Sequence, residues 1–103
     1  MKRVIAACAL SAAFVLAGAA LANEKLAQSS GCMTCHGVDK KIIGPTYKDI
    51  AAKYRGDKSA EASLIKKVKA GGKGVWGDIP MPPNAHLKDE DIKTLVAWVL
   101  AQK

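Results

Sequence analysis

Apolar residues recur at helical spacing near the end of the chain, where they give the clearest structural signal in the sequence. A helix is predicted over residues 88–101, and four of its residues share one apolar face: Ile92, Leu95, Val96 and Val99. Acidic residues occupy its first turn, where the helix dipole favours negative charge. This pattern predicts a terminal helix that packs one face against a core.

Three shorter helices are predicted over about residues 23–30, 46–54 and 60–70. Asn23 and Ser59 are suitable N-caps for the first and the third, and Pro45 is placed to open the second. The inward face of the third helix is expected to comprise Ala62, Ile65 and Val68. Together these elements predict an all-α domain of about four short helices without strands.

Two connecting segments are expected to be irregular. The shorter covers residues 38–44, and the longer covers residues 71–87, which contain four glycines and three prolines. A long irregular loop in a small domain usually has a function. The longer loop is therefore a place to look for binding residues.

The first 22 residues have the organisation of a secretory signal peptide. Lys2 and Arg3 precede an apolar, alanine-rich stretch that closes on a small-residue cleavage motif ending at Ala22. We predict cleavage there, which leaves residues 23–103 as one periplasmic domain. An uncleaved anchor is the alternative, because the stretch is just long enough to span a bilayer, but the cleavage motif favours removal. Cys8 lies too near the start for a lipoprotein signal.

The domain that remains is small and basic. The whole chain carries a net charge of +7, and removal of Lys2 and Arg3 lowers this to +5 before any cofactor is counted. Such a surplus steers association with acidic partners or anionic membrane surfaces. Nucleic acid is a poor candidate, because arginine is scarce and no basic block contains interleaved aromatic residues. A domain of this size also needs stabilisation beyond its modest core.

That stabilisation is indicated by Cys32-Met-Thr-Cys35-His36, the C-x-x-C-H attachment pattern for c-type haem. Each thiol adds to one vinyl group of the porphyrin, and the histidine is carried beneath the ring to one axial site of the iron. One covalent haem c is therefore predicted, attached to Cys32 and Cys35 and ligated by His36. Short helices would wrap around it.

Other uses of two cysteines at this spacing fit less well. A zinc site needs four ligands, and no second cysteine pair or histidine pair follows. A thioredoxin-like dithiol would need a βαβ pattern, which the sequence lacks. A structural disulfide is geometrically possible in an exported protein, but it gives no reason for His36.

Two residues compete for the second axial site of the iron. Met81 lies in the long loop between Pro80 and Pro82, which stiffen the backbone that would present its sulfur. A Met/His pair raises the potential of cytochromes c, whereas bis-histidine ligation by His86 would lower it. Met33 is tethered too near the ring edge to reach the opposite site. We predict Met81 as the ligand, the other interpretation being a gap-filling core methionine.

Two further residues are candidates for the surroundings of the haem. The second ring nitrogen of His36 should hydrogen-bond a carboxylate or a carbonyl, and Pro45 belongs to the nearest stiff segment that offers one. Trp76 is either a core residue or a donor to a haem propionate, because a buried indole N–H needs a partner. Trp98 belongs to the final helix and is expected to be a packing residue.

Together these motifs resemble the class I cytochromes c, and in particular the small bacterial monohaem cytochrome c-551 group. The resemblance covers nearly all of residues 23–103: the haem motif behind a first helix, Gly44-Pro45-Thr46-Tyr47-Lys48-Asp49-Ile50, the glycine-rich stretch with Trp76, Ile79-Pro80-Met81-Pro82-Pro83-Asn84, and Ala97-Trp98-Val99-Leu100. This combination is much more specific than the haem motif alone. One departure is Leu87-Lys88, where the group commonly has a Ser or Thr cap.

The resemblance implies roles for individual residues. It implies that His36 and Met81 are the axial ligands and that the Pro45 carbonyl accepts a hydrogen bond from the histidine. It further implies that Trp76 donates to a propionate and that Asn84 donates to the methionine sulfur. From its own neighbours alone, Asn84 would be interpreted as a turn residue.

The expected function is that of a monomeric, soluble periplasmic electron carrier and not of an enzyme. The resemblance implies outer-sphere one-electron transfer between respiratory donors and a terminal reductase, oxidase or peroxidase. No stable membrane insertion is expected after cleavage. One alternative is an enzyme or gas sensor whose iron keeps an open site, although Asp78 is the closest carboxylate to Met81 and no acid–base pair stands there. The other alternative is a haem domain cut from a larger enzyme.

Overall fold

Four α-helical segments and one 3₁₀ turn build the part of the chain that the structure describes. The structure is a computed structural model that describes residues 22–103. In chain order it contains a helical segment at residues 22–29, η1 (Cys32–Thr34), α2 (Tyr47–Lys53), α3 (Ala60–Ala70) and α4 (Asp89–Leu100). This described part contains no strand, and the predicted all-α class is confirmed. The predicted signal peptide lies outside it except for Ala22.

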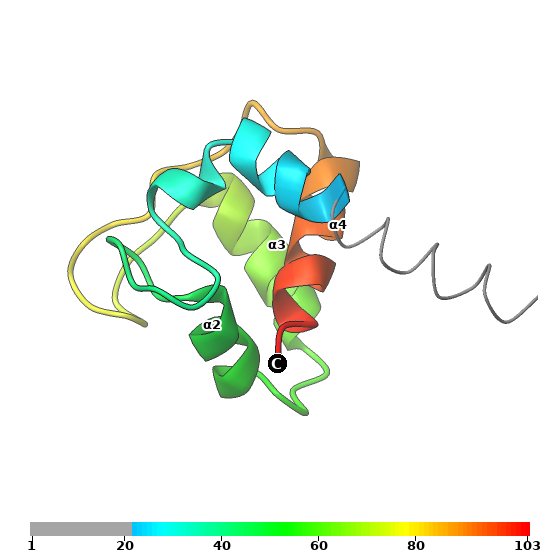
Figure 1. Ribbon diagram of the computed structural model, residues 1–103. Coiled ribbons are helices and arrows are strands. Elements are labelled where there is room, and N and C mark those ends of the chain that lie inside the picture. Colours follow the sequence, from blue (N-terminus) through cyan, green and yellow to red (C-terminus); the bar gives the residue numbers. More distant parts are fainter. Residues whose placement is uncertain (1–21) are drawn as a thin grey trace, which may run out of the picture.

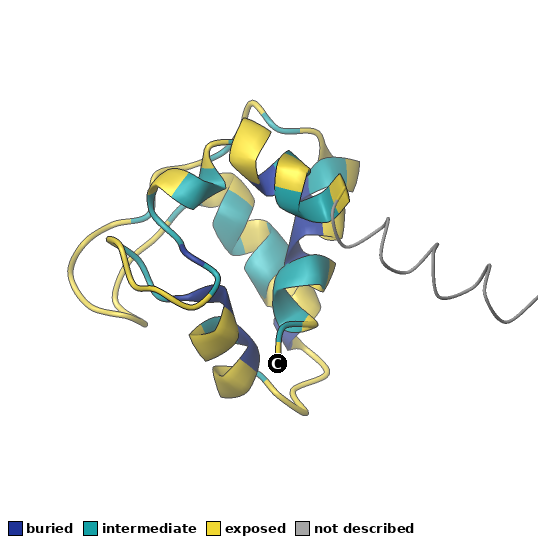
Figure 2. Cartoon of the chain, viewed as in Figure 1, coloured by how far each residue is buried: buried dark blue, intermediate teal, exposed yellow. Residues whose placement is uncertain are grey.

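The apolar face of α4 forms the centre of the core. Ile92 is completely buried, and Leu95 and Val96 are almost completely buried, as the spacing of apolar residues predicts. α4 packs against both α2 and α3, and Figure 1 shows the helical segment at residues 22–29 lying across it. The dark-blue positions in Figure 2 follow these contacts.

Thr46 determines where α2 begins. Its hydroxyl accepts a hydrogen bond from the backbone N–H of Asp49 at 3.0 Å, which is the geometry of an N-cap. Thr46 is therefore the cap and not the first helical residue, and α2 is one residue shorter at each end than predicted. Tyr47 and Ala51 face the core and are buried.

The inward face of α3 differs from the prediction. Ala62 is exposed, whereas Leu64 and Val68 are half-buried and line the interior cavities described below. With the buried Ala60 they follow a spacing of four residues, and Ile65 is half-buried beside them. The prediction was wrong at Ala62 because an alanine buries little apolar area, so the larger neighbouring side chains decide the orientation of the helix.

Ser59 stands at the N-cap position of α3 but does not cap it with its side chain. Its backbone N–H and its hydroxyl both donate to the carboxylate of Asp57, at 2.9 and 2.7 Å. These hydrogen bonds hold the pKa of the Asp57 carboxyl below its ordinary value. The expected Ser59 cap is thus replaced by a turn in which Asp57 fixes the residue before the helix.

Two other helix starts also depart from simple capping. The first helical segment already includes Ala22 and continues through Asn23, so Asn23 is not its N-cap. Lys88 occupies the N-cap position of α4 without a side-chain hydrogen bond, in agreement with the missing Ser or Thr. The acidic residues in the first turn of α4 stabilise it through the helix dipole instead.

The segment between α3 and α4 is irregular, as predicted, apart from one isolated β-bridge. Gly72 and Met81 exchange two backbone hydrogen bonds of 3.1 and 2.8 Å. We call residues 72–81 the methionine loop. Its residues 72–80 are all exposed and appear yellow in Figure 2. Within residues 22–103 no helix combines the length and the hydropathy of a membrane span.

Candidate functional site

The loop that follows the C-x-x-C-H motif is folded back on itself by backbone hydrogen bonds. We call residues 35–46 the histidine loop. The carbonyl of Cys35 accepts from the N–H of Gly44 at 2.8 Å. The carbonyl of Gly37 accepts from Tyr47 at 2.9 Å, which ties the loop to the first turn of α2. These bonds bring the end of the loop against the imidazole of the motif.

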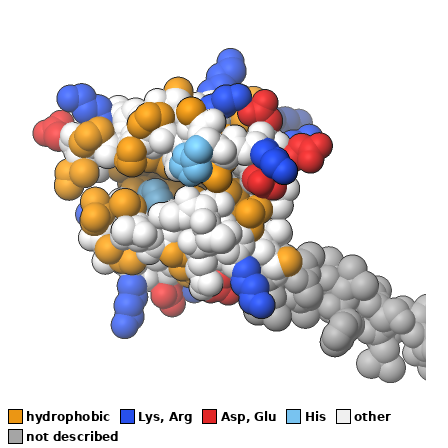
Figure 3. Space-filling model, turned by 90° about the horizontal axis from the view of Figure 1, so that it is seen from above, with side chains coloured by type: hydrophobic (Ala, Val, Ile, Leu, Met, Phe, Trp, Pro, Cys, Tyr) orange, Lys and Arg blue, Asp and Glu red, His pale blue; other side chains and the backbone are white. Residues whose placement is uncertain are grey.

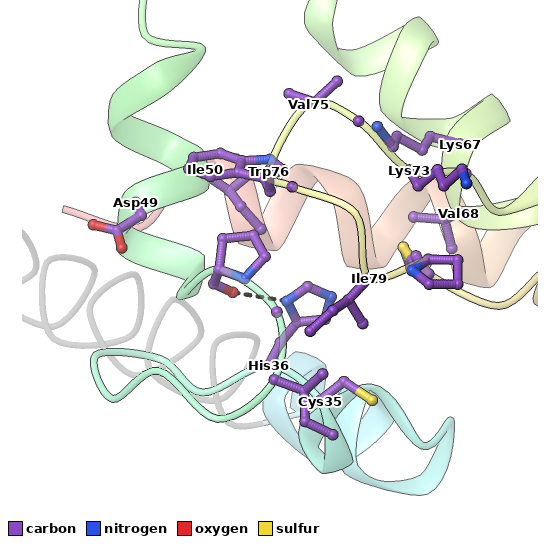
Figure 4. Close-up of a pocket in the computed structure, with 18 of the residues that line it drawn as sticks. Cys35, His36, Asp49, Ile50, Lys67, Val68, Lys73, Val75, Trp76 and Ile79 are labelled. Atoms are coloured by element: carbon purple, nitrogen blue, oxygen red, sulfur yellow. Dashed lines mark hydrogen bonds between the residues drawn. The ribbon is translucent and has the colours of Figure 1, made fainter.

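His36 is oriented through its δ nitrogen. Nδ1 donates to the carbonyl of Pro45 at 2.7 Å, the hydrogen bond that the sequence predicts and that Figure 4 shows as a dashed line. Because a carbonyl only accepts, the proton is on Nδ1 and the lone pair of Nε2 is left for a metal. The imidazole also stacks on Tyr47, with ring centroids 5.6 Å apart and an interplanar angle of 27°.

Gly44 lets the histidine ring lie directly against the backbone. A Cβ atom at this position would stand 2.6 Å from Cε1 and 3.0 Å from Nδ1 of His36. Optimal contacts between carbon atoms begin at about 3.5 Å. The backbone of Gly44 has no positive φ, so the close approach of the ring alone requires glycine here.

Cys32 and Cys35 are half-buried free thiols. Cys32 lines a cavity of about 70 Å³, and Cys35 lines a larger cavity of about 410 Å³. Burial raises the pKa of the Cys32 thiol above its ordinary value. Within the described residues no group of three His, Cys, Asp or Glu side chains is placed to hold a metal ion.

Met81 is half-buried at the end of the methionine loop and lines both cavities. The bridge to Gly72 fixes its backbone. Gly71 lies against the same segment, and a Cβ atom there would stand 2.6 Å from the carbonyl oxygen of Met81. Gly71 also has a φ of +76°, so both its conformation and its surroundings favour glycine.

The two cavities adjoin, because five side chains line both of them: His36, Ile50, Leu64, Val68 and Met81. The two predicted iron ligands are in this set, and each attachment cysteine lines one of the cavities. Most of the shared wall is apolar and comes from α2 and α3. An apolar space bordered by an imidazole, a thioether and two thiols suits a flat apolar cofactor. The residues present therefore fit a c-type haem.

The mouth of the larger cavity carries exposed apolar side chains and lysines. Its apolar residues are between 44% and 70% exposed: Ile43, Val75, Trp76 and Ile79. Three lysines also line it: Lys41, Lys67 and Lys73. Figure 3 shows one face of the molecule on which hydrophobic side chains gather, with charged side chains of both signs at its edges. Trp76 thus lies at the mouth and not in the core.

Asn84 makes different contacts from those implied by the resemblance. Its side-chain amide donates to the carbonyls of Val68 at 3.1 Å and Pro82 at 3.3 Å, which uses both amide protons. Its backbone N–H also donates to Val68, at 3.1 Å. The expected donation to the sulfur of Met81 is not found among the described residues. Asn84 instead anchors the end of the long loop to α3.

The other residues considered as iron ligands do not line the cavities. Met33 is half-buried and His86 is exposed, and neither lines either cavity. Trp98 packs edge-on against Tyr47, with ring centroids 5.2 Å apart. The expected packing role of Trp98 therefore agrees with the structure.

Several residues of the site are missed by sequence reasoning, among them Gly44, Tyr47 and Leu64. Spacing identifies Tyr47 as an inward-facing helix residue, but its contact with His36 depends on the return of the histidine loop. Its hydroxyl is the buried side-chain polar atom without a hydrogen-bond partner in residues 22–103, and burial raises its pKa. A glycine directly before a proline is the available signal for Gly44.

Comparison with known proteins agrees with this geometry. The family model described as cytochrome c matches residues 15–103. The chain belongs to the cytochrome c family. Haem c is therefore the cofactor of this cytochrome, attached at the motif that ends in His36.

This cytochrome is similar to named bacterial cytochromes c in sequence and in structure. It is 58% identical to cytochrome c-551 of Allochromatium vinosum over 88 residues, which are 85% of this chain and 94% of the relative. It is 46% identical to cytochrome c-552 of Nitrosomonas europaea over 93 residues, 90% of each chain. The crystal structure of wild-type Nitrosomonas europaea cytochrome c552 superimposes with a TM-score of 0.75 at 48% identity, covering 78% of this chain and 99% of that chain.

These comparisons confirm the predicted resemblance. This cytochrome is a small bacterial class I c-type cytochrome of the c-551 type. Its general function is electron transfer, and it is not an enzyme.

Proposed function

We propose that this cytochrome is a periplasmic electron carrier whose iron is held between His36 and Met81. The observation that carries the proposal is that both side chains line both adjoining cavities. The hydrogen bond from Nδ1 of His36 to the Pro45 carbonyl leaves the lone pair of Nε2 free, so that this atom would bind the iron. Bound haem supplies an iron that gains or loses one electron, at a potential raised by thioether ligation.

The chain retains and orients the cofactor. Cys32 and Cys35 prevent its loss through two thioether bonds, and the apolar walls exclude water from it. Because Gly44 and Pro45 fix the imidazole of His36 in advance, little rearrangement accompanies the change in charge. The N–H of Trp76, at the mouth, is proposed to donate to a haem propionate.

Absorption spectra of the holoprotein in both oxidation states test this ligand set. We expect a far-red sulfur-to-ferric-iron band in the native chain, and its loss together with a lower potential in Met81→Ala. His86→Ala is the matched control and should keep the band. Absence of the band from the native protein, together with a spectrum that changes in His86→Ala but not in Met81→Ala, would assign the second ligand to His86 instead. Rapid binding of carbon monoxide to the native ferrous protein would indicate an open site instead.

We also propose export and signal cleavage, on the evidence of the basic start, apolar stretch and cleavage motif in residues 1–22. Mass spectrometry of the protein from a periplasmic fraction should show a chain that begins at Asn23 and carries one haem. Recovery of the intact N-terminus from membranes would favour the anchor instead.

The redox partner is proposed to present an acidic surface and to be a respiratory donor or a terminal reductase, oxidase or peroxidase. Ten basic but only three acidic side chains fall between residues 40 and 73, a segment that includes α2, α3 and three lysines at the mouth. This asymmetry steers an acidic partner toward the haem. The bimolecular rate of electron transfer should then fall as ionic strength rises, and a rate independent of salt would contradict the proposal.

We expect this cytochrome to be a monomer in sedimentation experiments.

A further inference from the structure

The tip of the methionine loop has few connections to the rest of the protein. Within the described part of the chain, no hydrogen bond joins residues 73–80 to another element. The backbone contacts of the loop are the bridge at its base and a bond of 2.9 Å from the N–H of Gly74 to the carbonyl of Gly77. Trp76 lies inside this turn and is 44% exposed. Segments with such contacts open at low cost in free energy.

Lys53, in the last turn of α2, approaches this tip. Its Nζ lies 5.6 Å from the ring centroid of Trp76 and 5.8 Å from that of Tyr54, within the range of cation–π attraction. Both aromatic residues line the larger cavity, and Figure 4 shows Trp76 reaching from the loop toward α2. One ammonium group therefore links an aromatic ring at the end of α2 with one at the tip of the loop.

The charge of Lys53 is not engaged by a carboxylate. Within residues 22–103 the ion pair found is Lys69 with Asp89, between α3 and α4. The cation–π contacts are thus the polar contacts that the Lys53 ammonium group makes there. Lys66 offers a matched comparison, because it is also an exposed helix residue and makes neither an ion pair nor a cation–π contact within residues 22–103.

We propose that Lys53 is a positioning residue for Trp76, and that through the indole it holds the methionine loop closed over the haem site. Trp76 is five residues before Met81, so a loop tip that opens also loosens the backbone that presents the sulfur. Cation–π attraction at an exposed site corresponds to a shift of about two- to five-fold in the opening equilibrium. The effect on Met81 rests on the proposed ligation, whereas the effect on Trp76 does not.

The test compares three holoprotein variants: Lys53→Gln, Lys53→Arg and Lys66→Gln. Hydrogen exchange of the Trp76 indole N–H, followed by NMR, reports on the loop tip. The rate at which imidazole replaces the sixth ligand of the ferric iron, at about pH 8 where imidazole is neutral, reports on loop opening. We expect Lys53→Gln to accelerate both about two- to five-fold, Lys53→Arg to stay near the native values, and Lys66→Gln to change neither.

Equal rates in Lys53→Gln and Lys66→Gln would overturn the proposal, because both variants remove one charge. Faster imidazole binding without faster indole exchange would overturn it too, since the effect would then be one of charge and not of position. Absence of the far-red band in the native protein would refute Met81 ligation. The indole exchange of Lys53→Gln against Lys66→Gln would still decide the role of Lys53.

Discussion

The histidine loop and the methionine loop bring the two proposed iron ligands to the same space but are stabilised in different ways. The histidine loop is bonded through its backbone to itself and to α2, and its ligand ring is fixed by the Pro45 carbonyl and by Tyr47. The methionine loop is joined at its base by one β-bridge and is exposed from residue 72 to residue 80.

The difference indicates which half of the site the chain forms on its own. Protein contacts alone set the direction of the imidazole of His36, so this half is organised before the iron arrives. The backbone of Met81 is fixed only at the base of its loop, by the bridge to Gly72, and residues 73–80 make no hydrogen bond to another element in the described part of the chain. The histidine loop should therefore stay rigid, whereas the methionine loop should open locally.

Amide hydrogen exchange of the holoprotein gives the largest expected contrast. The amides of Gly44 and Tyr47 should exchange only with global unfolding, and the amide of Gly74 should exchange through local opening at a free energy near zero. Measurement by NMR at several pH values separates the two cases. Similar protection on both sides would show that the two loops do not differ as described.

A pair of glycine substitutions should show the next largest effect. Gly44→Ala places a methyl group 2.6 Å from Cε1 and 3.0 Å from Nδ1 of His36, and overpacking of this kind costs about 1–3 kcal/mol of unfolding free energy. Gly74→Ala meets open space at a φ of +106° and should cost about 1 kcal/mol. Denaturant unfolding gives both costs, and the ring-proton NMR signals of His36 should move only in Gly44→Ala. Unchanged His36 signals in Gly44→Ala would show that residue 44 does not contact the ring.

Asn84→Ala tests the anchor of the long loop. It removes the hydrogen bonds to the carbonyls of Val68 and Pro82, and we expect a loss of about 1–2 kcal/mol in unfolding free energy together with faster exchange at the amide of Met81. Asn84→Asp keeps the shape of the side chain but cannot donate these hydrogen bonds, so it should lose stability as Asn84→Ala does. A neutral result for Asn84→Asp would show that these bonds do not hold the loop.

Tyr47→Phe should have the smallest effect and the opposite sign. The hydroxyl is buried and has no hydrogen-bond partner among residues 22–103, so its removal should be neutral or stabilising by up to about 1 kcal/mol. Burial holds the pKa of Tyr47 above its ordinary value, so above about pH 10 the unfolded chain loses this proton more readily and the native chain loses stability as pH rises. The advantage of Tyr47→Phe should therefore grow above that pH in unfolding experiments. A constant difference would mean that the hydroxyl is solvated.

Much of the fold follows from local pattern. The face of α4 is predictable because Ile92, Leu95, Val96 and Val99 share one helical phase, and charged residues fill the other positions around Ile92 at the start of the helix. In α3 apolar residues occur at several phases, so spacing alone selects Ala62 where packing selects Leu64. Caps are harder still, because Ser59 can bond to Asp57 before the helix as readily as to the helix itself.

The same distinction applies to the site. Cys32, Cys35 and His36 are predictable because attachment chemistry requires them to be close in sequence, and the flanking prolines draw attention to Met81. The contact of Gly44 with His36 and the acceptors of Asn84 depend on where loops return in space. No local pattern contains that information.

The half-burial of the two thiols bears on how the protein is assembled. In the folded chain Cys32 lines a cavity of about 70 Å³, and burial raises its pKa, so few thiolates are available there. Thioether formation should therefore precede helix packing, with the attaching machinery acting on an open polypeptide. Haem attachment would then come before folding, and a chain that folded too early would remain without haem.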